Sequence, residues 1–122
     1  MIKSLGLDVV EISRITEDVE KYGSKFVQRI LGVSELALYA KRKDKLQFLS
    51  GRFAAKEAVI KALGRFLTTK PTLPEIQILN DSTGQPELFL DEKFSGLVKD
   101  KCFISITHEK SVAAAVAIFS EE

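Results

Sequence analysis

Residues 45–65 read KLQFLSGRFAAKEAVIKALGR, and this stretch decides the fold. Strong helix formers dominate it and Gly64 stands where a C-cap is expected, so it predicts one long helix. The apolar side chains go almost all the way around the helix axis, which predicts a helix buried on nearly every side. Its charged residues form two i, i+4 pairs, Arg52 with Lys56 and Glu57 with Lys61, and each pair shares one helix face.

The chain before this helix predicts a strand followed by short helices. Residues 4–12 are short, apolar and β-branched toward their end, as is typical of a strand. Ser13, Ser24 and Ser34 stand where N-cap residues are expected. They predict three short helices, one reaching residues 22–23, one over 26–31 and one over 36–39.

The chain after the long helix predicts two hairpins. The first hairpin is expected to have strands at 75–79 and 86–90 around the turn 80–84. A short helix from Asp91 over 94–98 follows it. The second hairpin is expected to have strands at 102–107 and 112–119, with His108 at the turn. This order predicts an α+β fold, an antiparallel sheet packed against a long central helix and short helices. No repeat or flexible linker interrupts the chain, so residues 1–122 are expected to form a single domain.

Composition excludes several classes of protein. With one cysteine, Cys102, and one histidine, His108, the chain fits neither a disulfide scaffold nor a zinc cluster. The first residues lack the apolar run of a signal peptide, and no segment has the length of a membrane span. These features predict a cytoplasmic protein.

Charge is unevenly distributed along the chain. Residues 1–65 carry 13 Lys and Arg against 8 Asp and Glu, whereas residues 66–122 carry 5 against 9. One interpretation is an ordinary solvated surface with uneven patches. The other is that the first half faces an acidic partner, and both nucleic acid and an acidic protein fit that pattern. The residues that would supply this face are Arg14, Lys21, Lys25 and Arg29, then Lys41, Arg42, Lys43 and Lys45.

Two acidic residues lie in apolar surroundings. Asp8 interrupts an apolar strand, where it either points to solvent or needs a partner or a metal, because a buried carboxylate is costly. Glu57 lies in the long helix, where it either pairs with Lys61 or faces a polar site. Two carboxylates from separate elements match Mg²⁺ better than Zn²⁺, since Mg²⁺ keeps several waters and completes its shell with substrate phosphates. A nearby lysine suits the phosphate charge, and no P-loop is present.

Four segments resemble the holo-acyl-carrier-protein synthases, the small trimeric members of the 4′-phosphopantetheinyl transferase superfamily. They are residues 6–14 (GLDVVEISR), 51–58 (GRFAAKEA) continuing to 61–64 (KALG), 80–86 and 104–109 (ISITHE). The chain departs from the family pattern in two places. Where the family has a Gly-Thr-Gly-type loop, residues 64–70 (GRFLTTK) keep only the first glycine. Thr107 stands where Ser usually precedes the histidine.

The resemblance implies transfer of the 4′-phosphopantetheine arm of coenzyme A to a serine of apo-acyl-carrier protein, with release of adenosine 3′,5′-bisphosphate. Asp8 and Glu57 would be the Mg²⁺ ligands, and Glu57 or a metal-associated water would take the serine proton. Lys61 would stabilise or protonate the leaving phosphate. Arg52, Gly64 and His108, together with Lys61, would contact the nucleotide.

The resemblance also implies the partners. Acyl-carrier proteins present an acidic helix, which Arg14, Lys21, Lys25 and Arg29 would suit, with Phe26 as an apolar anchor. A homotrimer with active sites between subunits is implied, and neither nucleic acid nor a membrane is expected as a partner. The carrier would serve fatty acid biosynthesis and lipid metabolism, or polyketide synthesis. The alternatives are a non-catalytic basic module for RNA or an acidic protein, and a Mg²⁺-dependent nucleotide hydrolase.

Overall fold

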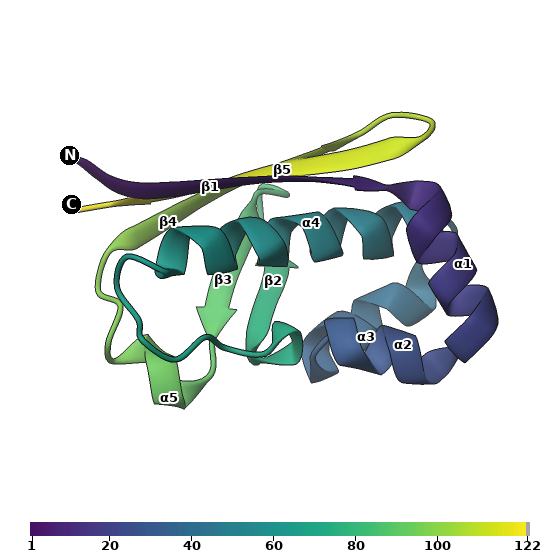
Figure 1. Cartoon of the computed structure of the whole chain (residues 1–122), viewed down its shortest axis with the longest axis horizontal. Helices are drawn as coiled ribbons and strands as arrows, with labels where there is room; N and C mark the ends of the chain where they lie inside the picture. The colour runs from purple at the N-terminus through teal and green to yellow at the C-terminus, as the bar shows by residue number, and fades with distance from the viewer. Residues whose placement is uncertain (122) are drawn as a thin grey trace.

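Figure 1 shows a computed structural model of the chain, which describes residues 1–121. The elements follow in the order β1 (Ile2–Glu11), α1 (Ile12–Tyr22), α2 (Ser24–Ile30), α3 (Val33–Lys41), α4 (Lys45–Leu63), a 3₁₀ helix η1 (Leu73–Glu75), β2 (Ile76–Asn80), β3 (Pro86–Leu90), α5 (Glu92–Ser95), β4 (Lys101–His108) and β5 (Val112–Ser120). The strands form two antiparallel sheets, β1-β5-β4 and β2-β3. The predicted α+β fold is confirmed.

Helix α4 lies at the centre of the molecule. The three-stranded sheet runs along one side of it, and α1–α3 and the β2–β3 hairpin lie on its other sides (Figure 1). The two ends of the chain lie side by side, since the Glu121 N–H donates to the Met1 carbonyl at 3.1 Å. Within residues 1–121, no helix is long and apolar enough to cross a membrane.

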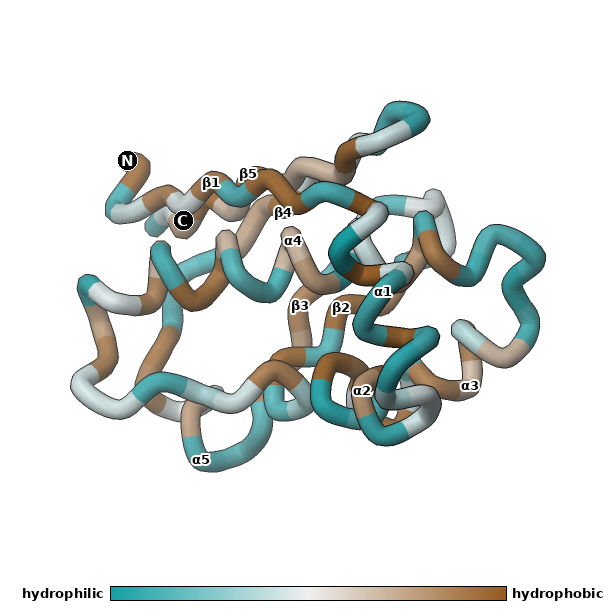
Figure 2. The backbone as a smooth tube through the Cα atoms, turned by 45° about the vertical axis from the view of Figure 1, so that its right-hand side comes forward, coloured by the Kyte–Doolittle hydropathy of each residue, from teal (hydrophilic) through white to brown (hydrophobic). Residues whose placement is uncertain are grey.

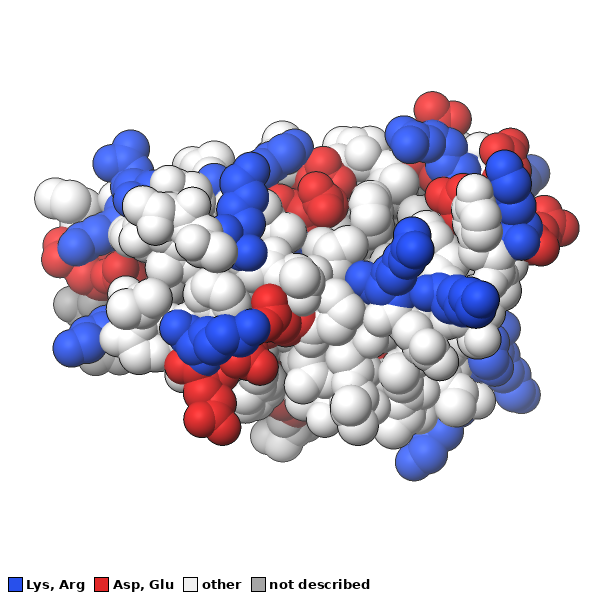
Figure 3. All heavy atoms as spheres, turned by 60° about the horizontal axis from the view of Figure 1, so that its bottom comes forward, with Lys and Arg blue, Asp and Glu red and all other residues white. Residues whose placement is uncertain are grey.

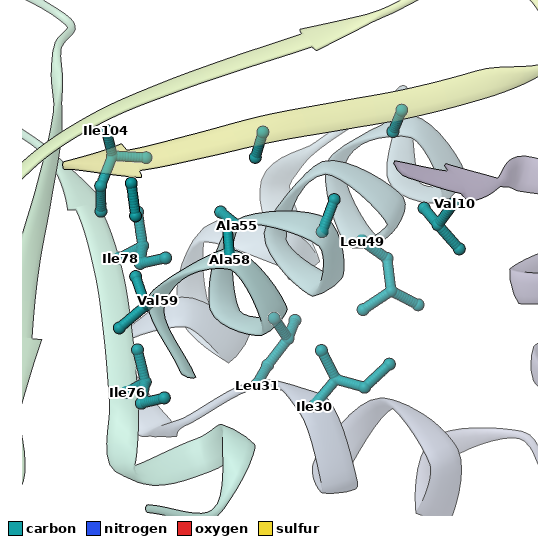
Figure 4. Close-up of a cluster of buried hydrophobic side chains, with 14 of the residues drawn as sticks. Val10, Ile30, Leu31, Leu49, Ala55, Ala58, Val59, Ile76, Ile78 and Ile104 are labelled. Atoms are coloured by element: carbon teal, nitrogen blue, oxygen red, sulfur yellow. The ribbon is translucent and has the colours of Figure 1, made fainter. Parts of the chain in front are cut away.

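The core surrounds α4 on nearly every side, as the sequence predicts. Figure 4 shows Ile30 and Leu31 from the α2 end and Ile76 and Ile78 from β2 directed toward this helix. Small residues face the three-stranded sheet, so β1 approaches the helix backbone closely. A Cβ built on Gly6 would lie 2.0 Å from the carbonyl oxygen of Ala58, so only glycine fits there. This contact sets the position of β1, and therefore of Asp8, against α4.

The predicted serine caps are wrong. Helix α1 begins at Ile12 with no side-chain cap bond, and α2 begins at Ser24 itself, after Gly23. Helix α3 begins at Val33, so Ser34 lies inside it. The carboxylate of Glu35 accepts from the Gly32 N–H at 2.9 Å and replaces a serine cap at that helix end.

Two further boundaries differ from the prediction. His108 is the last residue of β4, paired with Ala113, rather than a turn residue. Helix α5 ends at Ser95, which leaves Leu97 exposed outside it. Asp91 does cap this helix, because its carboxylate accepts from the Lys93 N–H at 3.1 Å.

The face of the three-stranded sheet that points away from α4 is apolar and uncovered. Leu5, Leu7 and Val9 of β1 are exposed there, each by about 60%, and Phe103 of β4 is 51% exposed. Ile118 of β5 lies between Leu5 and Phe103 in the sheet register. Brown, hydrophobic segments follow these strands in Figure 2. We call Leu5, Leu7, Val9, Phe103 and Ile118 the outer sheet face.

Candidate active site

Asp8 lies on the face of β1 that is directed toward α4. Alternate residues of this strand, Gly6 and Val10, are buried, and the Asp8 side chain is only 17% exposed. The ammonium of Lys61 donates to Asp8 Oδ1 at 3.0 Å and to the Leu7 carbonyl at 2.9 Å. Placement of Asp8 toward bulk solvent is therefore wrong.

Glu57 lies one turn before Lys61 on α4 and is half-buried. The structure shows no ion pair between Glu57 and Lys61 within residues 1–121, because Lys61 pairs with Asp8. Burial raises the pKa of Glu57, and the negative charge of Asp8 raises it further, while Lys61 and Lys70 act in the opposite direction. The two carboxylates are thus close enough to repel one another, which is the setting that a bound cation relieves.

The donors available for a metal are hard oxygens. No third His, Cys, Asp or Glu joins Asp8 and Glu57 in the part of the chain that the structure describes. Two carboxylates without a further protein ligand fit Mg²⁺, which keeps several waters and rarely takes an all-protein shell. We call Asp8, Glu57 and Lys61 the carboxylate–lysine cluster. Gly64, exposed at the end of α4, lies three residues after Lys61 on the same side of the helix.

Arg52 lies in a second site, a cavity of about 360 Å³ between α4, β4 and the β2–β3 hairpin. Its guanidinium donates to the Ile78 carbonyl and to Asn80 Oδ1, both at 2.9 Å, and only 6% of the residue is exposed. Exposed His108 lines the same cavity from the end of β4. We call this cavity the Arg52 pocket. Its carbonyl and amide partners hold Arg52 rigidly at the wall.

Sequence reasoning missed other residues of the Arg52 pocket. The Phe48 ring contacts two guanidinium groups, with the Arg52 carbon 4.6 Å and the Arg42 carbon 5.0 Å from its centre. Asp44 accepts from Arg42 through both oxygens, at 2.7 and 2.8 Å, and this pairing raises the pKa of Arg42. The run Arg42 to Phe48 carried only a charge signal in the sequence. The contact of one aromatic ring with two cations forms only when the loop that carries Arg42 folds back on α4.

The predicted site residues therefore form two separate groups in one chain. Asp8, Glu57, Lys61 and Gly64 lie together, whereas Arg52 and His108 line the pocket. Because α4 has 3.6 residues per turn, Arg52 and Glu57 point about 140° apart around its axis. A larger cavity of about 750 Å³ between β3 and β4 is lined by neither group.

The basic residues predicted to bind a partner lie on α1 and α2, which pack against each other. All four cationic side chains are exposed, and Figure 3 shows blue side chains around this end of the molecule with red ones among them. Phe26 is only half-exposed and packs against the core, so part of its ring already serves the fold.

Comparison with known proteins adds the family. The profile of the 4′-phosphopantetheinyl transferase superfamily matches residues 4–117. A holo-[acyl-carrier-protein] synthase of Enterococcus faecalis is 43% identical over 124 residues, covering 100% of both chains. One from Chlorobaculum tepidum is 41% identical over 116 residues, covering 94% of this chain and 96% of the relative.

Solved structures agree with the sequence relatives. The holo-[acyl-carrier-protein] synthase of Neisseria meningitidis superposes with a TM-score of 0.90 at 29% identity, over 99% of this chain and 100% of the other. The Helicobacter pylori enzyme in complex with coenzyme A superposes with a TM-score of 0.82 at 32% identity, over 95% and 99%. The chain therefore belongs to the 4′-phosphopantetheinyl transferase superfamily, among the holo-[acyl-carrier-protein] synthases.

Proposed function

We propose that this chain transfers the 4′-phosphopantetheine arm of coenzyme A to a serine of an apo-acyl-carrier protein and releases adenosine 3′,5′-bisphosphate, with Mg²⁺ as cofactor. Residues 1–122 would form one transferase domain that works in the cytoplasm, in fatty acid biosynthesis or polyketide synthesis. The observation that carries the proposal is the carboxylate–lysine cluster. Two mutually repelling carboxylates beside an ammonium make a site for a cation together with a phosphate.

Asp8 and Glu57 would hold the metal, with pyrophosphate oxygens of coenzyme A and water as further ligands. Bound Mg²⁺ supplies Lewis-acid polarisation of the attacked phosphorus and neutralises charge on the leaving phosphate. Glu57, or a water held beside it, would take the serine proton. Lys61 brings an ammonium to the leaving phosphate and stabilises or protonates it.

The Arg52 pocket would receive the nucleotide end of coenzyme A. Arg52 is fixed by two neutral acceptors and has no carboxylate partner within residues 1–121, so its positive charge is available to an anion. His108 at the rim adds a hydrogen-bonding ring near the same opening. We propose the 3′-phosphate as the group that these two residues bind.

The two groups would meet across a subunit boundary. They face different sides of α4, the arrangement expected when one chain supplies the carboxylate–lysine cluster and its neighbour supplies the Arg52 pocket. The outer sheet face gives the apolar surface that association needs, since exposed patches of this kind mark interfaces. Phe103 and Ile118 of this face also line the larger cavity, so the apolar surface continues into it. We propose a homotrimer.

The carrier protein would dock on α1 and α2. Arg14, Lys21, Lys25 and Arg29 offer exposed cations to its acidic helix, and the exposed part of Phe26 offers an apolar contact. Such rim charges act mainly through the rate and orientation of encounter.

Mass spectrometry tests the function directly. Apo-carrier proteins from fatty acid and polyketide synthesis are incubated with the protein, coenzyme A and Mg²⁺. A gain equal to one phosphopantetheine arm is expected, and neither Asp8→Asn nor Glu57→Gln should give it while their circular dichroism stays that of the wild type. No gain on any carrier would refute transfer, and release of nucleotide without a carrier would favour a hydrolase.

A further inference from the structure

The ammonium of Lys61 contacts the carboxylate of Asp8, one of the two groups proposed to hold the metal. Lys61 Nζ lies 3.0 Å from Asp8 Oδ1 and 2.9 Å from the Leu7 carbonyl oxygen. The Asp8 side chain is 17% exposed, whereas the Lys61 side chain is 54% exposed. The carboxylate is therefore fixed in the wall of the site, and the lysine is a long flexible arm that is able to swing away from it.

Charge in the cluster is balanced only in part. Glu57 experiences the negative charge of Asp8 and the positive charges of Lys61 and, after it, Lys70. With Lys61 on Asp8, one carboxylate is compensated and Glu57 has no ion-pair partner within residues 1–121. A divalent cation arriving alone must break the Lys61–Asp8 ion pair or bind beside the ammonium. Either route weakens its binding, because the first loses the ion pair and the second brings two like charges together.

A phosphate changes that balance. An arriving pyrophosphate offers Lys61 a stronger partner than a single carboxylate oxygen, since it presents several charged oxygens. When the ammonium moves to the phosphate, both Asp8 oxygens become free. The two ligands then bind next to one another with opposite charge.

We propose that Lys61 is an internal counter-ion of the metal site, which holds Asp8 in the free protein, opposes the binding of Mg²⁺ alone, and leaves Asp8 only when coenzyme A offers it a phosphate. Mg²⁺ and coenzyme A consequently strengthen each other's binding, and by linkage the factor is the same in both directions. Lys61 is a positioning residue in this step, in addition to its role toward the leaving phosphate. The inference rests on the proposed function for its second ligand.

Lys61→Met keeps most of the side-chain stem and removes the charge. Calorimetric titration of Mg²⁺ into the protein without coenzyme A should show about three- to fivefold tighter binding to this variant than to the wild type, the range expected for loss of one exposed ion pair. Lys61→Arg retains the charge and should remain close to the wild type. Lys99→Met, at an exposed lysine outside the cluster, is the matched control and should leave Mg²⁺ affinity unchanged.

The same titrations are repeated with saturating coenzyme A. The wild type should gain more Mg²⁺ affinity from coenzyme A than Lys61→Met does. Equal or weaker binding of Mg²⁺ alone to Lys61→Met would overturn the counter-ion role, as would an equal gain from coenzyme A in both proteins. Absence of Mg²⁺ binding in every condition would overturn the metal site itself.

Transfer activity separates this inference from the proposed function. If the wild type modifies a carrier protein and Lys61→Met shows no change in Mg²⁺ affinity, the function stands and the counter-ion role fails. If Lys61→Met binds Mg²⁺ more tightly but the wild type modifies no carrier, the counter-ion role stands and the transferase function fails.

Discussion

Lys56 and Glu35 form an ion pair in which both side chains are fully buried. The Lys56 ammonium also donates to the carbonyls of Ile30 and Leu73, and the Glu35 carboxylate accepts from the Ile78 N–H at 2.8 Å. Burial lowers the pKa of Lys56 to about 8, and the nearby carboxylate opposes that shift. The buried ion pair and its hydrogen bonds thus connect α4 to α2, α3, η1 and β2. They also hold β2 beside the Arg52 pocket.

Lys56→Met should destabilise the protein by about 3–5 kcal/mol, because it leaves the Glu35 carboxylate buried without a counter-charge. Urea unfolding gives the free energy of unfolding. The double variant Lys56→Met with Glu35→Leu should cost less than the two single changes together, since no charge remains buried. A free energy of unfolding for Lys56→Met within about 0.5 kcal/mol of the wild-type value would contradict the role of this ion pair in stability.

Gly6→Ala should destabilise the protein by about 1–3 kcal/mol or more, because the added Cβ would lie 2.0 Å from the Ala58 carbonyl oxygen and force β1 away from α4. Displacement of β1 also moves Asp8, so transfer should fall. Gly96→Ala is the control, since nothing lies within 4 Å of its added Cβ. Equal stability of the two variants would show that β1 does not need this close approach.

His108→Ala should weaken the use of coenzyme A through its 3′-phosphate. We expect a rise of about three- to tenfold in the KM for coenzyme A, the range of one net hydrogen bond. With dephospho-coenzyme A, which lacks the 3′-phosphate, steady-state kinetics should give the same KM for His108→Ala and the wild type. Because His108 is exposed, the fold should survive the change. The same KM increase with both substrates would place the histidine elsewhere on the nucleotide.

Arg14→Glu should raise the KM for carrier protein by roughly fivefold, because it puts a like charge against the acidic helix of the proposed partner. The KM for coenzyme A should stay unchanged. Lys99→Glu makes the same charge change away from α1 and α2 and serves as the control. An unchanged carrier KM for Arg14→Glu would remove α1 from the docking surface.

Leu7→Lys should convert the proposed trimer into monomers and abolish transfer. Leu7 is 59% exposed on the outer sheet face, so a lysine there costs the isolated chain little but cannot be covered by a second copy. Sedimentation velocity measures the state of assembly. Val33→Lys, at a residue 83% exposed on α3, should leave it unchanged. A wild type that sediments as a monomer, or an active monomeric Leu7→Lys, would contradict the shared site.

Local pattern alone determined much of this fold. The apolar residues of 45–65 surround the helix axis, so no face of this segment is polar enough to remain in water. Helix α4 is therefore buried, as predicted. Strand β3 matches its prediction at both ends, because Pro86 and Asp91 mark boundaries that neighbouring residues define. The motifs around Asp8 and Glu57 were enough to predict these two acids as members of the candidate site, because residue type and order alone define the motifs.

Only the tertiary structure decided which groups meet. Lys61 pairs with Asp8, 53 residues away, rather than with Glu57 on its own helix. Arg52 donates a hydrogen bond to Asn80, 28 residues away in the sequence, and Lys56 donates one to Glu35, 21 residues away. Helical spacing fixes which side chains share a face, but a charged group pairs with the partner that packing brings within hydrogen-bond distance. That choice depends on how β1, α3 and β2 close around α4, which no local pattern encodes.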